Sequence, residues 1–298
     1  MVLPLISAVV VTYQPDAKLL DHLHRLSSRV AEIILVDNGS GGSSLQFVES
    51  AARLPGVELR RNGSNLGIAT ALNMGIRRAL SFGRPWIATF DQDSAISENY
   101  FEGLFQAYET CPASRNVGMI VPGGWGEPRA RAGKPQPARG AWSFVRGAVN
   151  SGSLIKAEVF STAGSFDDAL FIDYVDTDFC LRLQKCGFKI LSAAGVFLEH
   201  ELGEKQTCRG PGFQISFRVH TAWRYYYIVR NRLVLYRRHL AVSPLWVLRD
   251  AAWLVLELGR ILCLEKGRKS KLPAAFRGLC DGLRGRTGRH PSFPPGGA

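Results

Sequence analysis

The sequence has no long uncharged hydrophobic run. Of its 298 residues, 46% are hydrophobic. The most apolar stretch near the C-terminus is nevertheless interrupted by Arg249, Asp250, Glu257 and Arg260, so no run reaches the roughly 18 residues that a membrane span needs. The start, MVLPLISAVVVTY, lacks the basic region and small-residue cleavage site of a signal peptide. We therefore expect neither a spanning helix nor a secretory leader.

Patterned cysteines are also lacking. The six cysteines form no C-x-x-C pair and do not follow the spacing of zinc ligands. In a chain of this length they are typical of free thiols in a reducing compartment. We expect a cytoplasmic protein.

Acidic residues are scarce in one part of the chain only. Residues 202–298 hold 18 Lys and Arg against 5 Asp and Glu, whereas residues 1–201 hold 19 against 20. The formal net charge of +12 therefore comes from the C-terminal third. Such a basic segment can bind nucleic acid, anionic lipid or phosphorylated ligands, or can simply be a solvated face. No nucleic-acid-binding motif is recognisable, and we expect no nucleic-acid partner.

What the first half does contain is a regular alternation of strand and helix patterns. Continuous apolar runs typical of parallel strands alternate with segments whose leucines recur at helical spacing. This alternation predicts an α/β fold with helices packed on a central, mostly parallel sheet. The expected strands lie in residues 5–13, 31–40, 57–67 and 85–94, and the expected helices in residues 17–29, 43–54 and 68–83.

The second half divides differently. The Pro-, Gly- and Arg-rich residues 121–140 have no periodicity and predict a loop. We expect a catalytic domain over residues 1–212, an amphipathic helical region over residues 213–283, and a disordered tail over residues 284–298. The helical region would lie either against the domain or on a bilayer surface.

Two expected strands end in acids. Asp37 closes ILVD, and Asp91 and Asp93 follow WIATF one residue apart. Ligands bind outside the carboxyl ends of such strands. Side chains at i and i+2 of an extended chain point the same way, so these carboxylates would repel each other unless a cation lies between them. Asp93 and His200, the last residue of FLEH at the end of a later expected strand, could bind Mg²⁺ or Mn²⁺. A solvated turn is the alternative.

An ordered set of motifs now resembles the inverting glycosyltransferases of family 2, which have the GT-A fold. More narrowly, it is similar to bacterial rhamnosyltransferases that use dTDP-L-rhamnose. The resemblance covers residues 6 to about 232, roughly three quarters of the chain. It rests on VVVTYQP, ILVDNGS, NLGIATALNMGI, FDQDS, NSGSLI, FIDYVDTDFCLR and YYIVRN.

The resemblance implies a role for each matching residue. Asp93 and His200 would bind the metal, and Asp176 would be the base. Val175 stands where many relatives have Glu, so that acid has no role here. The acceptor side would hold Asn150, Ser151, Gly152, Asp178, Arg230 and Asn231. The nucleotide and donor would lie against Thr12, Tyr13, Pro15, Asp37, Asn65, Gly67 and Asp91.

The resemblance also implies an activity. It is a metal-dependent, inverting transfer of a sugar to a hydroxyl of a lipid-linked or saccharide acceptor in bacterial cell-surface polysaccharide synthesis, such as O-antigen or exopolysaccharide. The donor would be dTDP-L-rhamnose, or alternatively a UDP-hexose; a non-catalytic nucleotide-binding relative is the third alternative. An amphiphilic acceptor and the basic C-terminal third predict a peripheral position on an anionic membrane, at the inner face of the cytoplasmic membrane.

Overall fold

The structure is a computed structural model that describes residues 5–126, 140–200, 205–210 and 213–293. At residues 200, 205, 208–210 and 213–215 only the backbone is described. Contacts divide the chain into two compact units. Unit 1 comprises residues 1–167 and 176–201, and unit 2 comprises residues 168–175 and 202–298. The domain boundaries expected at residues 212 and 283 stay predictions.

Unit 1 is built on one mixed sheet. Among the described residues its strands follow the order β3-β2-β1-β4-β8-β6-β9-β5, with β7 paired to β9. The strands are β1 (Ile6–Thr12), β2 (Glu32–Asp37), β3 (Val57–Arg61), β4 (Trp86–Asp91), β5 (Ser94–Ala95), β6 (Val117–Trp125), β7 (Trp142–Val145), β8 (Ser153–Lys156) and β9 (Lys189–His200). The predicted α/β class with a mostly parallel central sheet is confirmed: β3, β2, β1 and β4 are parallel neighbours, as are β6 and β9.

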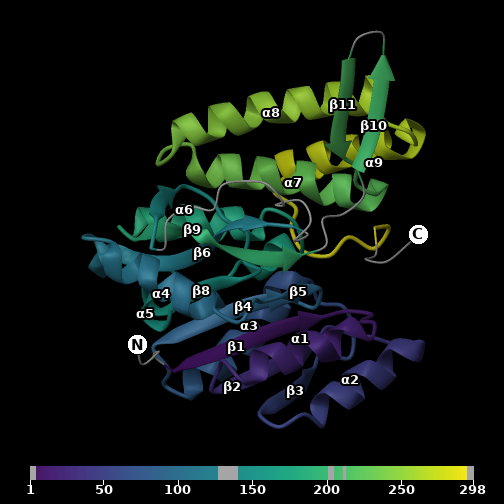
Figure 1. Cartoon of the computed structure of the whole chain (residues 1–298). Helices are drawn as coiled ribbons and strands as arrows, with labels where there is room; N and C mark the ends of the chain where they lie inside the picture. Colours follow the sequence, from purple (N-terminus) through teal and green to yellow (C-terminus); the bar gives the residue numbers. More distant parts are fainter. Residues whose placement is uncertain (1–4, 127–139, 201–204, 211–212, 294–298) are drawn as a thin grey trace. The chain divides into compact units, whose positions relative to one another are not determined.

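Helices cover both faces of this sheet (Figure 1). Every residue of β1 is buried, as its continuous apolar run predicts. Leu19, Leu23 and Leu26 of α1 join the core cluster that contains Ala8 and Val10. Gly75 of α3 meets Val9 on the opposite face. The helices are α1 (Lys18–Ser27), α2 (Leu45–Ala52), α3 (Ile68–Ser81), α4 (Tyr100–Thr110), α5 (Ala157–Thr162) and α6 (Val175–Lys185).

Unit 2 combines a β-hairpin with three long helices. Its elements are β10 (Lys205–Gly210), β11 (Phe213–Arg218), α7 (Ala222–His239), α8 (Pro244–Cys263) and α9 (Arg268–Leu283). The helices confirm the helical character expected after residue 212, but residues 213–218 form an antiparallel strand with β10. None of the helices in the described part of the chain is long and apolar enough to cross a membrane.

Two further expectations for unit 2 need correction. Residues 284–293 are described and return to α7, where the Phe293 ring stacks on Tyr226 at 4.6 Å and the Tyr227 hydroxyl donates to the Phe293 carbonyl. Residues 294–298 lie outside the described residues. In addition, aromatic residues mixed with arginines in a basic segment favour a lipid headgroup layer, but the three tyrosines 225–227 are fully buried in the core of unit 2.

Candidate functional site

The ends of three parallel strands define one edge of the sheet in unit 1. Thr12 pairs with Asp37 across β1 and β2, and Val11 pairs with Asp91 across β1 and β4. Thr12, Asp37 and Asp91 therefore end neighbouring strands at the same edge. This is the edge where ligands of parallel α/β sheets bind, as the sequence predicts.

Gln92, between the two acids of the D-x-D pair, was not predicted to have a role. Its Oε1 accepts hydrogen bonds from Thr12 Oγ1 at 2.7 Å and from the Tyr13 backbone N–H at 2.8 Å. The exit of β1 is thus tied to the turn after β4. A pocket of about 150 Å³ at this point is lined by Pro15, Gln92 and Asp93 among others.

A buried histidine lies beneath this turn and was also missed. His22 of α1 packs edge-on against Phe90, with ring centroids 5.5 Å apart. Burial, opposed in part by the Gln92 backbone and the charge of Asp93, lowers the pKa of His22 to about 4. The imidazole is therefore neutral near pH 7, and helical leucine spacing alone gave no signal for it.

Asp37 is buried and begins a second polar turn. Its Oδ1 accepts from the Ser40 N–H at 3.0 Å. The next residue, Asn38, joins this turn to the one before α3: Asn38 Oδ1 accepts from the Leu66 N–H, and Asn38 Nδ2 donates to Asn65 Oδ1 at 3.1 Å. Asn65 Oδ1 also accepts from the Gly67 N–H at 3.0 Å. Asn65 therefore shapes the turn in which it lies.

The residues before β8 connect the D-x-D strand to α6. Ser151 Oγ accepts from the Asp91 N–H at 3.0 Å, and the Asn150 carbonyl accepts from Thr89 Oγ1 at 2.6 Å. Asn150 Nδ2 donates to Asp176 Oδ1 at 2.8 Å. The buried Asn150 Oδ1 has no hydrogen-bond partner among the described residues.

Gly152 allows this turn to form. Its φ is +80°, and an added Cβ would lie 2.6 Å from the Tyr100 hydroxyl oxygen. That hydroxyl donates to the Gly152 carbonyl at 2.6 Å. Burial raises the pKa of Tyr100, so the phenol stays a donor at neutral pH.

The structure separates the two candidate acids of α6. Asp176 is half-buried and receives the Asn150 hydrogen bond. Asp178 is 1% exposed, and its Oδ2 lies 2.7 Å from Arg182 Nε. Arg182 also donates to the carbonyls of Ala163 and Ser165. Asp178 is thus part of a buried ion pair inside unit 1.

Arg230 and Asn231, expected on the acceptor side, are buried in unit 2. Asn231 Nδ2 donates to the carbonyls of residues 170, 172 and 173 at 2.8–3.0 Å, and Arg230 Nη2 donates to the Leu170 carbonyl at 2.9 Å. In this segment Phe171, Asp173 and Tyr174 all have φ between +61° and +66°, which costs about 1–2 kcal/mol per residue. Both side chains hold a strained segment that ends just before Asp176.

No group of three or more His, Cys, Asp or Glu residues gathers as a metal site among the side chains that the structure describes. His200 is described by its backbone alone, which pairs with Ser94, the residue after Asp93. The chemistry of the pair still fits, because carboxylate and imidazole suit Mn²⁺ or Mg²⁺ and a diphosphate can supply further oxygens.

Two solved structures share the fold over almost the whole chain. One is the mannosyltransferase PcManGT from Pyrobaculum calidifontis, in complex with GDP-Man and Mn²⁺, with a TM-score of 0.57 and 17% identity, covering 94% of this chain and 87% of that one. The other is S. aureus TarS 1-349 in complex with UDP-GlcNAc, with a TM-score of 0.55 and 13% identity, covering 94% and 81%. At these identities the likeness shows the fold, and the predicted GT-A type is confirmed.

Sequence comparisons give closer relatives. A family model described as glycosyl transferase family 2 matches residues 7–160. The chain is 30% identical to dTDP-rhamnosyl transferase RfbF of Shigella flexneri, covering 95% of this chain and 97% of the relative. It is 26% identical to N-acetylglucosaminyl-diphospho-decaprenol L-rhamnosyltransferase of Mycobacterium tuberculosis, covering 89% and 95%.

Proposed function

Because the chain belongs to glycosyltransferase family 2, we propose that it transfers L-rhamnose from dTDP-L-rhamnose, with inversion, to a hydroxyl of a lipid-linked or saccharide acceptor in cell-surface polysaccharide synthesis. The donor is supported by the name of the relative from Shigella flexneri. A lipid-linked acceptor is supported by the name of the mycobacterial relative.

The nucleotide lies against the ends of β1 and β2 in this proposal. Asp37 accepts the N3–H of the pyrimidine, which distinguishes thymine or uracil from purines. Thr12, Tyr13 and Pro15 line the base, while Asn65 and Gly67 lie along the nucleotide and Asp91 near the sugar. The shared strand edge of Thr12, Asp37 and Asp91 supports this placement.

A divalent cation, Mg²⁺ or Mn²⁺, would be held by Asp93 and His200. When bound it would stabilise the negative charge that builds on the leaving diphosphate. The adjacency of Ser94 and residue 200 in the sheet supports this pair.

Asp176 is the base. The acceptor oxygen attacks C1 of the sugar, the bond from C1 to the diphosphate oxygen breaks, and the hydroxyl proton passes to Asp176. The observation that carries the proposal is the hydrogen bond from Asn150 to Asp176, next to Ser151, which binds the Asp91 backbone. These contacts hold the base in register with the D-x-D strand. Asn150, Ser151 and Gly152 form the acceptor side. There, Asn150 Oδ1 can accept a hydrogen bond from a hydroxyl of the acceptor substrate.

The protein works on the inner face of the cytoplasmic membrane in this proposal, because a lipid-linked acceptor lies there. The basic excess of residues 202–298 suits anionic headgroups, and each cation near such a surface contributes about 1 kcal/mol. Arg230, Asn231 and Asp178 support the site from buried positions without touching the acceptor.

The experiment is a donor panel of dTDP-rhamnose, UDP-glucose, UDP-galactose and GDP-mannose, scored by nucleotide release with Mg²⁺ or Mn²⁺ and after metal stripping. We expect release from dTDP-rhamnose alone and its loss in EDTA. Asp93→Asn should lower turnover by about two orders of magnitude or more, since a metal ligand is lost. Preference for a UDP-hexose would overturn the donor, and full turnover without metal would overturn the role of Asp93.

A further inference from the structure

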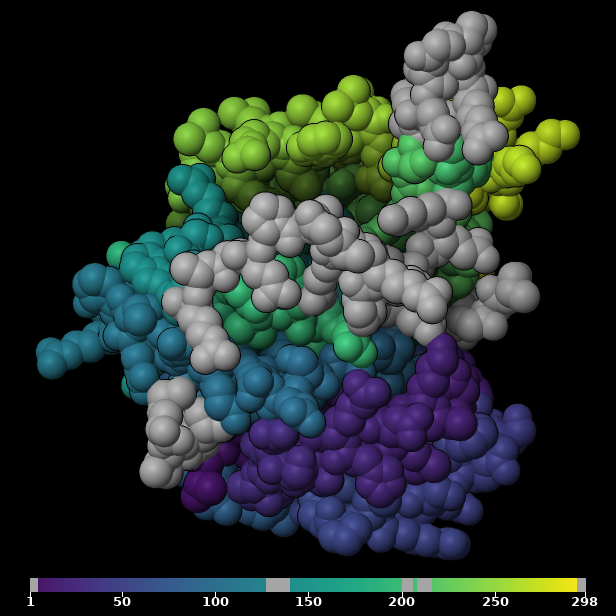
Figure 2. Space-filling view, in the orientation of Figure 1, coloured from purple at the N-terminus to yellow at the C-terminus, as the bar shows by residue number. Residues whose placement is uncertain are grey.

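Helix α8 has apolar side chains on its outer side as well as on its inner side, where Val247, Leu254 and Ile261 are buried. Its outward side chains Leu245, Leu248, Val255, Leu256 and Leu262 are 56–69% exposed. The helical spacing of these residues places them along one side. Figure 2 shows the light-green side chains of α8 at the molecular surface along the helix. A surface helix normally points this stripe at the core and its charges at water.

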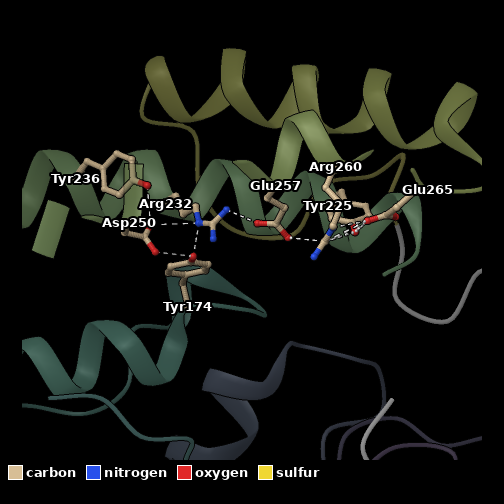
Figure 3. A network of polar contacts seen from close by, with 8 residues as sticks. All are labelled: Tyr174, Tyr225, Arg232, Tyr236, Asp250, Glu257, Arg260 and Glu265. Atoms are coloured by element: carbon tan, nitrogen blue, oxygen red, sulfur yellow. Dashed lines mark hydrogen bonds and ion pairs between the residues drawn. The ribbon is translucent and has the colours of Figure 1, made fainter. Parts of the chain in front are cut away.

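The two carboxylates of α8, Asp250 and Glu257, point inward toward α7 (Figure 3). Asp250 Oδ2 lies 3.2 Å from Arg232 Nε of α7 and accepts from the Tyr236 hydroxyl at 2.6 Å. Glu257 pairs with the same Arg232 and with Arg260. The pKa of Arg232 is raised: burial opposes its charge, but its neighbours, including both carboxylates, outweigh burial. The carboxylates that interrupt the apolar run therefore do not interrupt the outer face.

Apart from the exposed Asp168, the exposed charges of unit 2 that the structure describes have one sign. Within residues 205–293, as far as the structure describes them, Asp250, Glu257, Glu265 and Asp281 are all buried or half-buried, and each pairs with a cation. The exposed charged side chains are all basic: Arg218, Arg237, Arg238, Arg249, Lys266, Arg268, Lys269, Arg277, Arg284, Arg286 and Arg289.

We propose that the outward face of α8 inserts into an anionic bilayer at the boundary between headgroups and acyl chains. The leucine and valine side chains enter the apolar layer, and Arg249, at the same surface, meets lipid phosphate. A second copy of the chain is a poorer occupant, since it would bring the exposed basic side chains around α8 against those of another copy. The inference rests on the proposed peripheral association with the membrane. It adds to the electrostatic attraction an apolar contribution to membrane binding, which salt does not screen.

The test uses vesicles and the full-length protein. Phosphatidylcholine vesicles with and without phosphatidylglycerol are sedimented with wild type at low salt and in about 1 M salt, where the screening length falls to about 3 Å. We expect binding to anionic vesicles that salt weakens but does not abolish. The Leu248→Ser, Val255→Ser double variant should bind about tenfold more weakly and lose the salt-resistant fraction. Leu5→Ser, an exposed apolar change in unit 1, is the matched control and should bind as wild type.

Insertion has a readout of its own. Trp253 on α8 is 63% exposed, so brominated lipids should quench part of the tryptophan fluorescence, and Trp253→Phe should remove that part. The insertion would be overturned if high salt released all of the wild-type protein from anionic vesicles. It would also be overturned if the double variant bound these vesicles as tightly as wild type. A wild-type dimer in solution that dissociates in the double variant would overturn it too. Release of nucleotide with water as the acceptor should be the same in the double variant and in wild type, because this reaction needs no membrane. If wild type itself releases no nucleotide, the proposed function is contradicted but the insertion is not.

Discussion

Asp176 and Asp178 lie two residues apart in the first turn of α6, and the family resemblance assigns the base to Asp176. Their surroundings differ: Asn150 Nδ2 contacts the half-buried Asp176, whereas Asp178 is sealed against Arg182. A base must meet a proton from the acceptor, which a fully buried, ion-paired carboxylate does not.

Asp176→Asn keeps the shape of the side chain and removes its ability to take a proton. We expect transfer to fall about a hundredfold or more, chiefly in kcat, while donor affinity measured by calorimetry stays at the wild-type value. Asp178→Asn is the comparison: it weakens a buried pair and should lower the unfolding temperature first. A stable, inactive Asp178→Asn beside an active Asp176→Asn would reverse the assignment.

Asp37 carries a separate prediction. If it accepts the N3–H of the base, Asp37→Ala should weaken dTDP binding by about 1–3 kcal/mol, the cost of an unsatisfied buried partner. Calorimetry with dTDP measures this loss. Asp21→Ala, an exposed acid of α1, controls for charge. Unchanged affinity in Asp37→Ala would remove Asp37 from the nucleotide site.

The helices and strands of the first half could be predicted because each repeats one apolar period. The later elements could not. Residues 121–125 look like part of a loop by composition, yet they complete β6, because pairing with β9 outweighs the weak strand preference of Pro and Gly. Residues 213–218 pair with β10, a non-local choice that no helical period reveals. Tyr225–Tyr227 suggested a lipid interface, but packing of α7 against α9 buries them.

That packing depends on Gly278 of α9. A Cβ there would lie 2.4 Å from the Tyr226 carbonyl oxygen, so the two helices meet through backbone atoms. We expect Gly278→Ala to destabilise the protein by about 1–3 kcal/mol, the usual cost of overpacking, measured by urea unfolding.

Gly259→Ala provides the matched control. Gly259 lies in α8, and an added Cβ meets nothing within 4 Å. The same change should be neutral or stabilising there by about 0.5–1 kcal/mol, since alanine favours a helix over glycine. Equal effects of the two substitutions would show that the close approach of α9 to α7 is unimportant.

Across the molecule, the sequence predicted the positions of strand-end residues better than the contacts of individual side chains. The strand-end acids lie where parallel topology places them, because period and register fix that edge. Gln92 and His22 were missed, since a glutamine in a turn and a histidine on an apolar helix have no distinctive pattern. Asn231 was predicted for the acceptor side. Its side chain is buried, however, and its Nδ2 donates to three backbone carbonyls.

Asn231→Ala tests this structural role. It removes the Asn231 donor from the carbonyls of residues 172 and 173 and one of several donors from the Leu170 carbonyl, in a segment whose left-handed residues relax readily. Because that segment continues directly into Asp176, we expect kcat to fall about tenfold or more with donor affinity retained, and amide exchange in residues 168–175 to accelerate. A loss of acceptor affinity alone, with exchange unchanged, would restore the contact role.

The hydrogen bonds from Asn231 to the carbonyls of residues 170, 172 and 173 also set the order in which parts of the protein can fold during synthesis. The three strands that carry Thr12, Asp37 and Asp91 can pair once the ribosome has released the first ninety or so residues. The Leu170 carbonyl also accepts from Arg230 and Asn231, sixty and sixty-one positions later in the sequence, and Arg230 in turn donates to the carbonyl of Gly288. A nascent chain can therefore form the strand edge of Thr12, Asp37 and Asp91 early, whereas the segment that leads into Asp176 gains all of these contacts only after residue 288 has been synthesised.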